Sequence, residues 1–82
     1  MKYNVPLSSM LKDESGTITG LEGGRRFGFR LEAMGVRAGT ELTVVNKSCF
    51  RGPVTVKMGN AQIALGHGMA EKIIMEVDRE QT

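Results

Sequence analysis

Two alternating segments joined by a two-residue turn are the feature that most constrains the fold of this chain. In residues 54–58 and again in residues 61–65, apolar side chains recur at every second position, which is the period of a half-buried β-strand. Gly59-Asn60 separates the two segments and suits the tight turn of a hairpin. The pattern therefore predicts an antiparallel hairpin with one face in the core.

Further segments of strand type extend this hairpin into a sheet. Residues 17–21, 40–45 and 73–77 are rich in β-branched or alternating apolar residues and are bounded by turn residues. About five strands with short connections close most naturally into a small antiparallel barrel. We expect a mostly β fold with one or two short helices, built as a single domain over residues 1–82. The first helical turn is expected at residues 6–11, where a proline precedes two serines.

The second helix is predicted over residues 25–34. Phe27, Leu31 and Met34 fall at i, i+4 and i+7 and so share one face, and Gly35 suits a left-handed C-cap. Phe29 lies about 200° around this helix from Phe27, so it points away from the core. Two interpretations remain open for Phe29: a partly covered ring packed on Arg25, or an aromatic anchor for a partner.

Composition excludes several classes of protein. The 82 residues carry 11 Lys and Arg against 9 Asp and Glu, a net charge of +2 that is too weak to predict nucleic-acid binding. No apolar run approaches the roughly 20 residues that a membrane span needs, so no direct membrane insertion is expected. The start of the chain has no apolar signal segment, and the single Cys49 cannot form an internal disulfide. Both observations favour the cytoplasm.

The only histidine, His67, lies between two glycines at the bend that follows residue 65. A zinc or iron site needs several converging ligands, and one His with one Cys, in no recognised spacing, supplies too few. We therefore interpret the segment as a corner, with the two glycines supplying the change of direction, and assign no metal ligand and no catalytic residue. Cys49 is interpreted as a semi-buried small residue, because no acid is spaced to orient a Cys-His pair. A nucleotide loop at residues 20–24 lacks the required Lys-Ser/Thr ending.

Four segments together resemble the FeoA family: Pro-Leu-Ser at 6–8, Ser-Gly-Thr-Ile at 15–18, residues 30–42, and Ala-Glu-Lys-Ile-Ile-Met-Glu at 70–76. The most specific is Arg-Leu-x-x-Met-Gly-Val-x-x-Gly-Thr at 30–40. The resemblance implies an SH3-like barrel, with a short helical turn after residue 65, and a role in bacterial ferrous iron uptake beside the membrane transporter FeoB. Similar domains form the C-terminal part of metal-dependent repressors. This chain has no helix-turn-helix segment ahead of the matching region, so the repressor interpretation lacks its DNA-binding half.

Three function classes follow. The leading hypothesis is a non-enzymatic interaction module that binds the cytosolic region of a FeoB-type transporter, for which no cofactor is expected beyond weak Fe(II) binding. The alternative is a transition-metal sensor or carrier, which would bind Fe(II) stoichiometrically through His67 or the acidic tail. A nucleic-acid-binding barrel ranks last, because none of the four aromatic residues is expected in a strand. The expected partner-binding residues are Arg25, Arg26 and Phe29 on the helix, with Phe50 and Arg51 in a loop as the second surface. The oligomeric state is left open.

Overall fold

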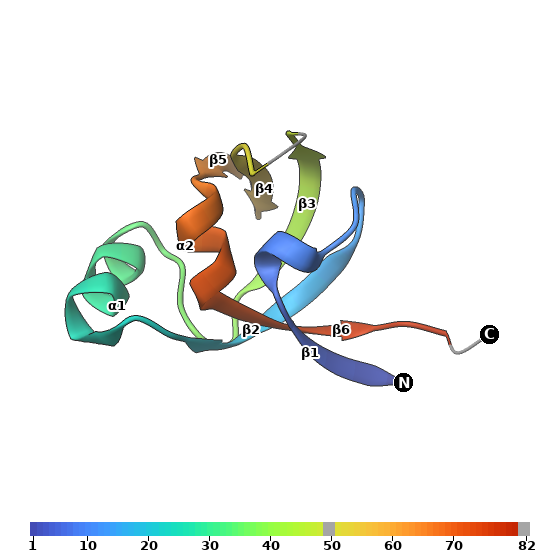
Figure 1. The fold of residues 1–82 in the computed structure, drawn as a ribbon, viewed down its shortest axis with the longest axis horizontal. Coiled ribbons are helices and arrows are strands. Elements are labelled where there is room, and N and C mark those ends of the chain that lie inside the picture. The colour runs from blue at the N-terminus through green and yellow to red at the C-terminus, as the bar shows by residue number, and fades with distance from the viewer. Residues whose placement is uncertain (49–50, 81–82) are drawn as a thin grey trace.

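The computed structural model describes residues 1–48 and 51–80. Predictions for Cys49 and Phe50 therefore lie outside the described residues. Along the chain, the helices and strands are β1 (Lys2–Pro6), the 3-10 turn η1 (Leu7–Ser9), β2 (Ser15–Leu21), α1 (Gly24–Ala33), β3 (Glu41–Lys47), β4 (Val54–Met58), β5 (Ala61–Leu65), α2 (His67–Lys72) and β6 (Ile73–Asp78). Figure 1 shows their arrangement, with α1 projecting at one end of the longest axis.

The strands form one antiparallel sheet in the order β1-β6-β2-β3-β4-β5. The mostly β prediction is confirmed, with six strands in place of about five. The sheet is also open, whereas a closed barrel was expected. Strand β1 adds to β6 on the side opposite β2, so β1 and β5 are the two edge strands, and no ladder among the described residues joins them.

The first strand was missed because its alternating apolar residues, Tyr3 and Val5, form only a short run that ends at Pro6. Residues 2–4 are exposed, and the strand is formed by pairing with β6, from Lys2 opposite Asp78 to Pro6 opposite Ile74. The helical turn expected at residues 6–11 is reduced to η1, because Pro6 ends β1 in an extended conformation. Tyr3 lies in β1, so the expectation that no aromatic residue lies in a strand is wrong.

The predicted hairpin is confirmed residue for residue. Strands β4 and β5 pair from Val54 opposite Leu65 to Met58 opposite Ala61, and Gly59 in the turn adopts the left-handed φ of 57°. The inward positions of β3, β4 and β6 fill one core, which also takes residues from η1, β2 and both helices. Among residues 1–48 and 51–80, fourteen hydrophobic side chains are buried there: Leu7, Met10, Ile18, Leu31, Val36, Leu42, Val44, Val54, Val56, Leu65, Ala70, Ile73, Met75 and Val77.

Helix α1 begins and ends one residue earlier than predicted, and its C-terminus shows why Gly35 was needed. Gly35 has φ of 86°, its N–H donates to the Glu32 carbonyl, and the Val36 N–H donates to the Leu31 carbonyl, both at 2.9 Å. This is the Schellman arrangement, closed by the buried pair Leu31 and Val36. Met34, expected on the core face, is 38% exposed because it is the cap residue beyond the helical face.

Helix α2 forms the corner between β5 and β6, as the resemblance implied. Its glycines do not act as predicted, however. Gly66 has φ of −59° and ψ of 154°, and Gly68 lies inside the helix, so neither uses a conformation reserved for glycine. The corner is held instead by the buried Ala70, whose N–H donates to the Gly66 carbonyl at 2.9 Å.

Candidate partner-binding surface

Helix α1 is joined to the sheet by the end of β2 on one side and by residues 34–40 on the other. Leu31 is its only fully buried residue, and Phe27 is partly buried against the core. The Lys72 Nζ lies 5.3 Å from the centre of the Phe27 ring, a cation–π distance. One side of α1 is thus attached to the body of the protein, while the other faces solvent.

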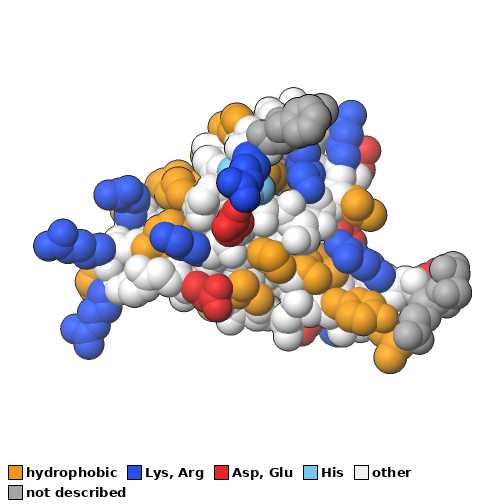
Figure 2. All heavy atoms as spheres, viewed as in Figure 1, with side chains coloured by type: hydrophobic (Ala, Val, Ile, Leu, Met, Phe, Trp, Pro, Cys, Tyr) orange, Lys and Arg blue, Asp and Glu red, His pale blue; other side chains and the backbone are white. Residues whose placement is uncertain are grey.

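The solvent side of α1 brings three of the predicted residues together. Arg25, Arg26 and Phe29 are all exposed, and Phe29 exposes 67% of its surface, so the prediction that its ring points away from the core is confirmed. At that exposure Phe29 is not the covered aromatic of the first interpretation. Figure 2 shows Lys and Arg side chains gathered over the end of the molecule where α1 lies.

Two more arginines and a methionine extend this surface beyond the sequence prediction. Arg30 and Arg37 are exposed beside the exposed Met34. Among the described residues, no ion pair involves any of the four arginines at positions 25, 26, 30 and 37. We call Arg25, Arg26, Phe29, Arg30, Met34 and Arg37 the α1 surface. The four arginines within residues 25–37 are the sequence feature from which the full extent of the α1 surface could have been predicted.

The second predicted surface is separate from the first. Arg51 is exposed in the loop between β3 and β4 and has a left-handed φ of 62°. Its predicted neighbour Phe50 lies outside the described residues. Figure 1 places this loop at the top of the molecule, away from α1, so the structure does not bring the two surfaces together.

His67 pairs with Glu71 one helical turn later, with 2.7 Å between Nε2 and Oε1. The His67 side chain is 28% exposed and that of Glu71 is 53% exposed. Over residues 1–48 and 51–80, no group of three or more His, Cys, Asp or Glu side chains could hold a metal ion. The arrangement is a surface pair on α2.

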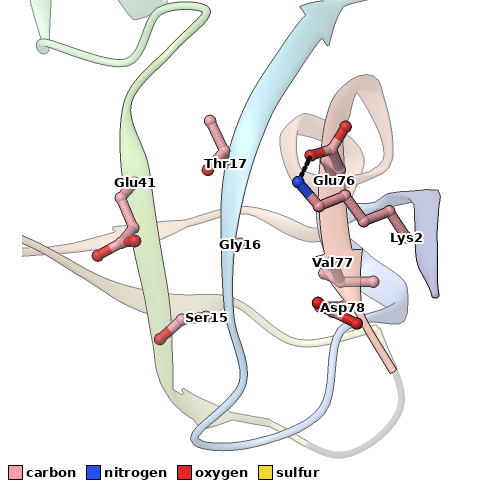
Figure 3. Close-up of a pocket in the computed structure, with 8 residues that line it drawn as sticks. All are labelled: Lys2, Ser15, Gly16, Thr17, Glu41, Glu76, Val77 and Asp78. Atoms are coloured by element: carbon pink, nitrogen blue, oxygen red, sulfur yellow. Dashed lines mark ion pairs between the residues drawn. The ribbon is translucent and has the colours of Figure 1, made fainter. Parts of the chain in front are cut away.

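Two acidic residues near the C-terminus make solvent-exposed ion pairs within the fold. Glu76 lies 3.5 Å from the Lys2 Nζ, and Asp78 lies 3.2 Å from the amino terminus. These side chains border a hollow of about 190 Å³ on the sheet, together with Ser15 and Glu41 (Figure 3). The floor is Gly16, where a Cβ would lie 2.8 Å from the Glu76 carbonyl oxygen. Gly16 therefore permits the close approach of β2 and β6.

A partly buried ion pair ties the C-terminal end to the β1–β2 connection, and no local sequence pattern indicates it. The Arg79 guanidinium donates from Nε and Nη2 to the two carboxylate oxygens of Glu14, each at 2.8 Å. The Leu11 N–H also donates to Glu14 at 3.0 Å. The hydrogen bonds from Arg79, aided by the one from Leu11, lower the pKa of Glu14 below its ordinary value of 4.5.

The open antiparallel sheet, the corner helix α2 and the exposed α1 surface define a small SH3-like accessory domain. The pattern of the FeoA domain matches residues 5–77. The chain therefore belongs to the FeoA domain family, a family of small accessory domains that is not a known enzyme family, and membership implies a role in ferrous iron uptake. No curated protein matches the chain. In the described residues, no helix is long and apolar enough to cross a membrane.

Solved structures agree with this assignment. A protein described as iron uptake regulatory protein (FeoA) is 26% identical with a TM-score of 0.81, over 92% of this chain and 99% of that one. Iron(II) transport protein A from Clostridium thermocellum is 29% identical with a TM-score of 0.81, over 89% of this chain and 45% of that one. A manganese-dependent transcriptional repressor, 18% identical with a TM-score of 0.83, shares the fold over 94% of this chain and 43% of its own.

Proposed function

We propose that this chain is a non-enzymatic interaction module of bacterial ferrous iron uptake, located in the cytoplasm, that binds the cytosolic region of a FeoB-type membrane transporter. The observation that carries the proposal is Phe29, which exposes 67% of its surface on a helix that buries only Leu31. A large aromatic side chain that the fold leaves uncovered is typical of the anchor of a protein interface.

The charges around Phe29 support a protein partner with acidic groups. Arg25 and Arg26 are exposed on the same helix and make no ion pair among the described residues. A guanidinium can bind a partner carboxylate through two parallel hydrogen bonds, while the ring of Phe29 supplies buried apolar area. Exposed charges of this kind act mainly on the association rate, so binding should weaken as salt is raised.

A pull-down from detergent-solubilised membranes tests the proposal. The immobilised chain should retain the transporter, and an Arg25→Gln/Arg26→Gln variant should retain much less. Lys12→Gln/Lys57→Gln is the matched control, because it also removes two exposed cations, both outside the α1 surface. A Phe50→Ala/Arg51→Ala variant tests the second predicted surface. Failure of the parent chain to retain the transporter would contradict the proposal.

The metal sensor or carrier is the competing function. Its proposed ligand His67 is paired with Glu71, and Glu76 and Asp78 are paired with Lys2 and the amino terminus. We therefore expect Fe(II) binding to be weak, and folding to be independent of metal. Anaerobic calorimetry of the parent and of His67→Ala decides this point. Stoichiometric, submicromolar Fe(II) binding that is lost in His67→Ala would favour the sensor over the interaction module.

A further inference from the structure

The open sheet ends in two edge strands, β1 and β5, which differ in how they are protected. Edge strands expose backbone N–H and C=O groups, and proteins commonly protect them with charged residues or proline. Strand β1 carries Lys2 and ends in Pro6. Strand β5 reads Ala-Gln-Ile-Ala-Leu, with neither a charge nor a proline. The edge at β5 is therefore open to pairing with another strand.

The hairpin register identifies which backbone groups are free on β5. Met58 and Ala61 flank the two-residue turn, so they form a hydrogen-bonded pair. Because such pairs alternate along an antiparallel ladder, the N–H and C=O groups of Gln62 and Ala64 point away from β4. Both residues are exposed, and in the described part of the chain no backbone bond from a loop or turn reaches them.

We propose that this edge pairs with β5 of a second copy of the chain, antiparallel, about a two-fold axis at Ile63. In this register Gln62 lies opposite Ala64 of the second copy, and Ala64 opposite Gln62. These are the residues with free groups, so the pairing forms four backbone hydrogen bonds. No charged residue meets a like charge, because β5 has none. The two Ile63 side chains, each partly buried on the core side, then cover one another.

The corner after β5 leaves room for this arrangement. In the same register, Asn60 of the second copy lies opposite Gly66. A Cβ on Gly66 would have no heavy atom within 4 Å, and the backbone there does not require glycine. Gly66 is the N-cap of α2, a position that favours glycine, and its lack of a side chain leaves space for the backbone of the second copy.

Sedimentation velocity over a range of concentrations tests the proposal. The parent chain should show a monomer–dimer equilibrium, and Ala64→Lys should weaken it roughly tenfold by placing two cations at the shared edge. Asn4→Lys adds the same charge to the exposed face of β1 and should leave the equilibrium unchanged. Gln62→Lys is a second edge variant should Ala64→Lys fail to fold. A parent chain that stays monomeric at millimolar concentration, or a dimer unaffected by either edge variant, would overturn the proposal.

A cross-link tests the register. In a Cys49→Ser background, Ile63→Cys places the two thiols opposite each other at the axis, where a disulfide should form rapidly on mild oxidation. Gln62→Cys places the thiols on diagonal positions and should cross-link far more slowly. The reverse order of rates would show that the axis is not at Ile63 and would overturn the register.

Discussion

The two helices of this protein differ in how they pack against the sheet and in which side chains they expose. Helix α2 has six residues, contacts η1, β1 and β6, and buries Ala70 at the corner between two strands. Helix α1 has ten residues, contacts chiefly β2, and buries only Leu31. Helix α2 exposes no large hydrophobic side chain, whereas α1 exposes Phe29 on its outer side, where packing within the fold gives the ring no role. Side chains that packing does not require are where a binding function is to be sought.

The largest expected effect tests the attachment of α1 to the body. Leu31 is fully buried and is the only such residue of the helix. Leu31→Ala should lower the free energy of unfolding by about 3 kcal/mol, because it removes buried methyl groups and leaves a cavity. Urea denaturation measures this change. An unchanged midpoint would mean that α1 is not anchored through Leu31.

A smaller effect is expected at the C-cap of α1. Gly35→Val should destabilise the protein by about 1–2 kcal/mol, because a branched residue must adopt a left-handed φ. Gly28→Ala is the matched control in the same helix. A Cβ there meets no atom within 4 Å, so this substitution should raise the free energy of unfolding by about 0.5–1 kcal/mol. Thermal melts compare the two. Equal effects of the same sign would contradict the left-handed cap.

A pH-dependent effect is expected in the body, away from α1. The pKa of Glu14 is lowered in the folded state by the hydrogen bonds from Arg79, so the unfolded state binds the proton more readily. The stabilisation is therefore complete above the ordinary pKa of 4.5 and is lost as the pH falls through the lowered value. In the Arg79→Gln variant, the melting temperature should therefore fall less steeply as the pH is lowered below 4.5. Substitution of the exposed Arg37 by Gln should leave this fall unchanged. Identical acid limbs would contradict the role of this pair.

Much of the sheet could be predicted from the sequence, because β4, β5 and β6 alternate and a clear turn at Gly59-Asn60 joins the first two. Strand β1 was not predicted, since its apolar run is short, residues 2–4 are exposed, and its place in the sheet depends on pairing with β6. Exposure of Phe29 could be predicted from helical geometry, while the exposure of Met34 depended on where the cap fell. The bond between Glu14 and Arg79 joins residues 65 positions apart, which no local pattern reveals.

The central claim is that the outer side of α1 binds the transporter without contributing to the fold. The direct measurement is a titration of the transporter's isolated cytosolic domain into labelled protein, with melting temperatures of the same samples. Phe29→Ala and Leu11→Ala form a matched pair, since their native side chains are 67% and 64% exposed. We predict unchanged melting in both, an affinity loss of about fivefold or more in Phe29→Ala, and no loss in Leu11→Ala. Equal affinity in all three proteins would contradict the claim.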